Sequence, residues 1–163
     1  MKPFSKIETK SISIILIVLS VVVFINMQVS LRRGRDSIRK NDIYAVEQAL
    51  DTFYQKYRFY PDATEDGKIV GCFSSGIVYD EITGLPTNME VCEWGKSSFE
   101  GIKIMPNDPS YEKGASYRYV SDNSESFFFY ISLEGQDEAE YTKLIADKNL
   151  QCGNRICNYG RGN

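Results

Sequence analysis

The stretch ISIILIVLSVVVFINMQV, residues 12–29, is almost entirely Ile, Leu, Val and Phe, and it contains no Pro. At about 1.5 Å per residue these positions extend about 27 Å as a helix, close to the hydrocarbon thickness of a bilayer. The run ends in Ser-Leu-Arg-Arg at 30–33 rather than in a small-residue cleavage site, so we expect a retained membrane span and not a cleaved signal peptide. A buried core helix is the less favoured alternative, because Lys flanks one end and Arg the other.

The residues after this run predict that the helix continues as an amphipathic one. Apolar side chains recur at spacings of three and four, and charged residues occupy the other positions. We expect the helix to stop at Phe59-Tyr60-Pro61, since the residue before a proline is biased away from the helical region. The organisation predicted is a leader-like N-terminus (1–11), a span (12–30), an amphipathic continuation (31–60) and a head (61–163). The predicted buried stripe consists of Ile43, Val46, Leu50, Phe53, Tyr54 and Tyr57.

Charge is divided between the two ends of the chain. Residues 1–40 carry eight Lys or Arg against Glu8 and Asp36, a net of +6, and the total of −3 leaves −9 for residues 41–163. The cluster from Arg32 to Lys40 has two interpretations: contact with lipid headgroups, or attraction to the acidic head of a neighbouring copy. An acidic head whose aromatics lie in strand-like runs does not fit nucleic-acid binding.

The four cysteines predict disulfides. Cys72, Cys92, Cys152 and Cys157 form no Cys-x-x-Cys pair, and the chain has no His, so a zinc site would need all four thiolates at unusual spacings. Of three connectivities we favour Cys72–Cys92 with Cys152–Cys157, since each closes a local loop. Disulfides place the head outside the cytoplasm, whereas the basic cluster favours the opposite orientation; long domains translocate regardless of flanking charge, so the cysteines carry more weight.

The head contains hairpin signals and no sign of an active site. Residues 116–120 and 126–133 alternate around a turn at 121–125, which places Phe127, Phe129, Ile131 and Leu133 on one face. Residues 62–101 read as irregular, with one short strand near 77–79, and 137–148 has helix-forming composition. Without His or a Gly-rich phosphate loop, an enzyme is not expected, although a pair of glycosidase carboxylates stays open. The sequence predicts an α+β fold: a long helix packed against a small antiparallel sheet.

Several motifs in this order resemble the type IV pilin superfamily, and most closely the major pseudopilins of bacterial type II secretion. The resemblance extends from Lys2 to about Glu140. It implies a membrane-held subunit that assembles with itself and with other pilin-like subunits into a thin filament, aided by an assembly ATPase and a membrane platform, without catalysis or an obligatory cofactor. The motifs are RDSIRKNDI (35–43), ALDTFY (49–54), YP (60–61), PNDP (106–109) and YRY (117–119).

The resemblance also implies a processing site. Residues 4–8, FSKIE, match the start of a mature pilin in part, so Phe4 would be the first mature residue and Glu8 the fifth. In the family this acid meets the amino terminus of a neighbouring subunit; otherwise Glu8 is an interfacial charge beside Lys6 and Lys10. Pro3 stands where the peptidase expects Gly, which leaves cleavage open and slightly favours a minor or divergent subunit.

Related pseudopilins carry a calcium loop after the last strands, and an acidic run lies in about that place here. The spacing departs from the family loop, so solvated acidic surface is the favoured interpretation and calcium the weaker one. The residues are Glu134, Asp137, Glu138 and Glu140.

Two functions of different class remain. The chain is either a filament subunit or a permanently anchored, non-assembling module that binds a partner outside the cytoplasm. Candidate contacts for the second are Tyr79, Trp94 and Phe99, whose more common fate is burial. The sequence does not distinguish secretion, DNA uptake, adhesion or motility.

Overall fold

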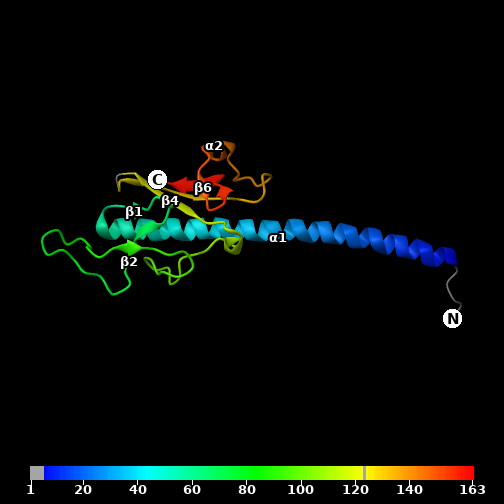
Figure 1. Ribbon diagram of the computed structural model, residues 1–163, viewed down its shortest axis with the longest axis horizontal. Helices are drawn as coiled ribbons and strands as arrows, with labels where there is room; N and C mark the ends of the chain where they lie inside the picture. Colours follow the sequence, from blue (N-terminus) through cyan, green and yellow to red (C-terminus); the bar gives the residue numbers. More distant parts are fainter. Residues whose placement is uncertain (1–5, 123) are drawn as a thin grey trace.

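The computed structural model describes residues 6–122 and 124–163, with helical side chains described from Lys10 onward. Its dominant element is α1, one unbroken helix over Lys6–Tyr57. Figure 1 shows that the head surrounds only the C-terminal half of α1 and that the N-terminal half projects away from it. Gly34 lies within this helix without a break.

The helix ends slightly earlier than expected. Arg58 adopts a positive φ of 67°, which ends α1 at Tyr57, before Phe59-Tyr60-Pro61. The projecting part provides one helix that is long and apolar enough to span a membrane, and none of its most apolar window is buried against the head.

Antiparallel strands cover α1. The larger sheet has the order β4-β5-β8, formed by Arg118–Asp122, Ser126–Ile131 and Tyr159–Gly162. A second sheet joins β1 (Asp62–Ala63), β2 (Ile69–Cys72) and β3 (Glu90–Val91). A small hairpin pairs β6 (Gln151–Cys152) with β7 (Arg155–Ile156), and two short helices complete the head: a 3₁₀ turn at Tyr111–Lys113 and α2 at Lys143–Ala146.

The predicted α+β fold is therefore confirmed, with local corrections. The hairpin forms with Tyr119 opposite Phe129, and its expected face is buried on α1. The strand expected near 77–79 is only an isolated bridge between Tyr79 and Pro86, because a tight turn replaces a ladder there. The strands of this region are β2 and β3 instead, and β6, β7 and β8 were not anticipated.

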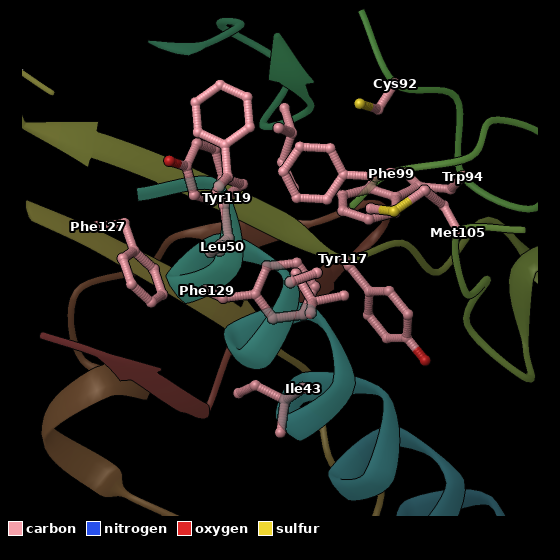
Figure 2. Close-up of a cluster of buried hydrophobic side chains, with 14 of the residues drawn as sticks. Ile43, Leu50, Cys92, Trp94, Phe99, Met105, Tyr117, Tyr119, Phe127 and Phe129 are labelled. Carbon is pink, nitrogen blue, oxygen red and sulfur yellow. The ribbon is translucent and has the colours of Figure 1, made fainter. Parts of the chain in front are cut away.

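The core lies between α1 and the two main sheets. Figure 2 shows Ile43 and Leu50 of α1 among aromatic rings from both sides. The predicted stripe is buried except for Tyr54, which stacks on Tyr60 at a ring separation of 4.6 Å. Trp94, the only tryptophan, contacts Tyr117 and Phe129 edge-on. The helix and the sheet thus share one aromatic core.

Two disulfides fasten the irregular parts of the head. They join Cys72 with Cys92, across β2 and β3, and Cys152 with Cys157, within the β6–β7 hairpin. These are the pairs that the sequence analysis favours. Closing such loops restricts the unfolded chain, which is typically worth about 2–4 kcal/mol for each disulfide.

Candidate functional site: the open face of α1 and its charged junction with the head

A buried ion network fixes the head to α1 just after the apolar run 12–29 of the helix. Arg39 is completely buried, and its guanidinium donates to Asp108 through Nε (2.7 Å) and Nη2 (2.9 Å). Its Nη1 donates to Asp36 Oδ1 at 2.7 Å. The guanidinium of Arg39 and the carboxylates of Asp36 and Asp108 therefore satisfy one another's hydrogen bonds in a position that excludes water.

Glu134 extends this network from the strand side. Its carboxylate accepts from Arg35 (2.5 and 2.9 Å) and from Arg39 (3.0 Å), and it pairs with Arg155 at 3.2 Å. In return, Asp36 accepts the backbone N–H groups of residues 134 and 135, both at 2.9 Å. Hydrogen bonding from Arg35, and then from Arg39, holds the pKa of Glu134 far below its usual range.

The remaining acids of 134–140 also pair with α1. Arg32 donates to Asp137 at 2.6 Å, and Lys40 donates to Glu138 and Glu140 at 3.0 and 3.1 Å. Within residues 6–122 and 124–163 no group of three acids is arranged to hold a metal ion. The acids of this segment thus form a partly exposed surface, with Asp137 53% and Glu140 35% exposed, that pairs with helix cations, and calcium binding stays a prediction. Helix cations already occupy the carboxylate oxygens of Glu134, Asp137, Glu138 and Glu140.

The same pairs involve the basic cluster, whose contacts with lipid headgroups or with a neighbouring copy stay predictions. Most of the cations from Arg32 to Lys40 pair with the acidic segment of their own chain. Arg33 is the exception: its side chain is 64% exposed, and it reaches Asp137 only at 3.6 Å. The head thus neutralises much of the positive charge next to the span.

Replacing Glu134 with Gln tests the network through pH. Because the folded-state pKa of Glu134 lies below its unfolded value, its contribution is complete above about pH 5 and disappears as pH falls towards the folded pKa. We expect wild-type protein to lose on the order of 2 kcal/mol more unfolding free energy between pH 6 and pH 2 than Glu134→Gln does. Urea titrations followed by Trp94 fluorescence measure this difference. The exposed substitution Glu112→Gln is the control, and equal pH profiles for Glu134→Gln and wild type would contradict the assignment.

The middle of the side of α1 away from the head consists of uncharged residues, and the exposed residues Arg33, Tyr44 and Asp51 border it. From Ser30 to Thr52, its exposed positions recur every three or four residues, so they lie on one face of the helix. We name this surface the open face. Every charged residue between 30 and 52 lies off it, and at its N-terminal end it runs directly into the span. It consists of Ser30, Leu31, Gly34, Ser37, Ile38, Asn41, Ala45, Gln48 and Thr52.

The charged residues beside the buried stripe hold the sheet against the helix. Glu47 accepts from Arg161 of β8 at 2.7 Å, and Asp42 accepts from the Tyr117 hydroxyl at 2.5 Å. Burial raises the pKa of Asp42 despite that hydrogen bond. These contacts lock the head in one orientation on α1, which leaves the open face uncovered.

The remaining predicted residues divide into three groups. Pro3 and Phe4 lie outside the described residues, and Glu8 falls within α1 with its side chain outside the described part. Trp94 and Phe99, candidates for partner contact, are buried in the core, whereas Tyr79 is 48% exposed. A signal for the open face was present in the sequence, since uncharged residues recur at helical spacing opposite the apolar stripe.

Comparison of the chain with protein-family models, with curated proteins and with solved structures gives no match.

Proposed function

We propose that this chain is a structural subunit of a type IV pilus-like filament or secretion pseudopilus, and that it assembles through α1 with its head outside the cytoplasm. Copies of the chain, together with other pilin-like subunits, would be its partners. An assembly ATPase and a membrane platform would drive its extraction from the lipid, as the resemblance implies. No reaction is assigned to the chain.

The observation that carries the proposal is the open face. The apolar span can remain in lipid. The open face continues beyond the span, along the part of α1 that would lie outside the bilayer, so lipid cannot cover it. Such a face suits a second apolar helix, because neither side leaves a charge unpaired on contact. The small residues Gly34 and Ala45 would allow close approach of the partner backbone.

Two further features support the proposed arrangement. The disulfides fit an oxidising compartment for the head. Arg32, Arg35 and Lys40 of α1 pair with Asp137, Glu134 and Glu138 of the head, and we name these pairs the charged junction. They neutralise most cations beside the span, so a filament core would not have to bury these cations unpaired.

Intact mass and N-terminal sequencing of the protein from its native membrane, without reductant, test the processing step. We expect a chain that begins at Phe4, carries Glu8 as its fifth residue, and has four fewer protons than the reduced chain. An intact Met1 on a monomeric protein would favour the alternative, and four free thiols would contradict the placement of the head.

The alternative is a non-assembling, membrane-anchored binding module. The feature that favours it is a cavity of about 430 Å³ at the membrane-distal end, bordered by Phe73, Ile77 and residues 98–103. This module would leave the open face uncovered, so substitutions there would not change its behaviour. The two functions therefore differ in a measurable way.

A further inference from the structure

A small polar cavity on the head has no part in the function proposed above. Its lining comes from the residue before β2, from the turn after β3 and from the segment around the 3₁₀ turn at Tyr111–Lys113. The cavity volume is about 250 Å³. Pockets for drug-sized ligands begin at roughly 300 Å³, so this cavity suits a single ring-sized unit.

Two aromatic side chains border the cavity, and they differ in exposure. Trp94 is only 9% exposed and packs edge-on against Tyr117 and Phe129 of the core (Figure 2). Tyr111 is 58% exposed, so its ring is open to solvent beside the cavity. Such rings combine a flat apolar face with a polar tip. The C–H face of a sugar ring packs well on a surface of this kind.

The indole N–H of Trp94 lacks a hydrogen-bond partner. Its Nε1 is buried, and no acceptor within residues 6–122 and 124–163 bonds to it. A buried donor without an acceptor is unfavourable, and a ligand oxygen that reaches Nε1 from the cavity would remove this cost. The orphaned donor therefore favours an occupant that is rich in acceptor oxygens.

The charged and amide groups of the lining leave further donors available. Lys68 is held by Glu93 at 2.9 Å, so these two charges cancel. Lys96 is exposed and forms no ion pair in the described part of the chain, which leaves one positive charge unbalanced at the cavity. The side-chain amide of Asn107 also makes no hydrogen bond to any described residue. The cavity thus offers a cation and neutral donors next to aromatic rings.

We propose that this cavity binds an acidic sugar unit, a pyranose ring that carries a carboxylate, at the exposed end of a glycan. The carboxylate pairs with the Lys96 ammonium, the sugar hydroxyls meet the Asn107 amide and the Trp94 N–H, and the C–H face of the ring packs on Tyr111. A bare anion would not use the aromatic rings, and a neutral sugar would leave Lys96 unpaired. The site does not depend on assembly through the open face.

An NMR titration with methyl β-D-glucuronide tests this site, and methyl β-D-glucoside is the matched neutral sugar. Trp94 is the only tryptophan, so its indole N–H gives one signal in ¹⁵N-resolved spectra of the full-length protein in detergent. We expect the glucuronide to shift this signal and to bind at least about tenfold more tightly than the glucoside, because it adds a charge-assisted hydrogen bond. No shift with the glucuronide, or equal affinity for the two sugars, would overturn the proposal.

Two lysine variants assign the preference to this cavity. Lys96→Gln should bring the affinities for the two sugars to within about twofold of each other, because the carboxylate loses its partner. Lys103→Gln removes another exposed lysine, one that does not border this cavity, and should keep the preference of the wild type. Both variants should keep the wild-type urea midpoint. A preference that survives in Lys96→Gln would contradict the assignment.

Acetate separates sugar recognition from attraction of a simple anion. We expect acetate, at the same concentrations, to leave the Trp94 indole signal in place. A shift as large as that with the glucuronide would show that the cavity takes a carboxylate alone, which would overturn the sugar site. The filament proposal would stand in each of these cases, since none of them involves the open face.

Discussion

Replacing Arg39 with Ala is expected to destabilise the folded head by about 3–5 kcal/mol, because it leaves Asp36 and Asp108 buried without their shared cation. That loss is comparable with the whole stability of many domains, so Arg39→Ala protein should be largely unfolded at 37 °C. Fluorescence of Trp94, which packs on Tyr117 and Phe129, reports the change in detergent-solubilised full-length chain during urea titration.

Two matched variants make this prediction specific. Arg39→Lys keeps the charge but cannot supply the Nε and Nη2 pair that binds Asp108, so we expect an intermediate loss. Arg33→Ala removes an arginine from the same helix at an exposed position and should change stability by no more than about 0.5 kcal/mol. If Arg39→Ala were as mild as Arg33→Ala, the buried network would not hold the head to α1.

A single charge on the open face is expected to abolish assembly while the head stays folded. Ala45 is exposed, and no Lys or Arg lies three or four residues from it, so the carboxylate of Ala45→Glu would face a partner helix unpaired. An uncompensated charge in a dry contact costs several kcal/mol. Since each 1.4 kcal/mol is a factor of ten, filament yield should fall by at least about a hundredfold.

The control for Ala45→Glu is Leu144→Glu on α2, which adds the same charge at a position that is 78% exposed. Both proteins should show wild-type Trp94 fluorescence and urea midpoints. The yield of assembled material in the sheared surface fraction should fall only for Ala45→Glu. Equal yields from the two variants would mean that the open face is not an assembly surface.

Local periodicity was sufficient to predict the helix, the hairpin and the buried stripe. The run 12–29 and the spacing from Ile43 to Tyr57 each depend on neighbouring residues along one helix, and the β4–β5 alternation depends on one short turn. Strand β8 was missed because Tyr-Gly-Arg-Gly lacks apolar alternation; its pairing depends on β5, which is distant in sequence.

The pairing in the charged junction could not be predicted from the helix cations alone or from the acidic segment 134–140 alone. The cations near Arg39 and the acids near Glu134 are separated by 95 residues, and each cluster alone is compatible with solvent, lipid or a metal ion. Their pairing follows only once the sheet fixes residues 134–140 beside the helix.

The most direct test of the account is to shear the surface of cells that carry the full-length chain and to examine the released material by electron microscopy and mass spectrometry. We predict thin filaments that contain this chain with both disulfides formed. If the chain instead remained wholly in the membrane fraction as a monomer, while its head was folded and outside the cytoplasm, assembly through α1 would be contradicted.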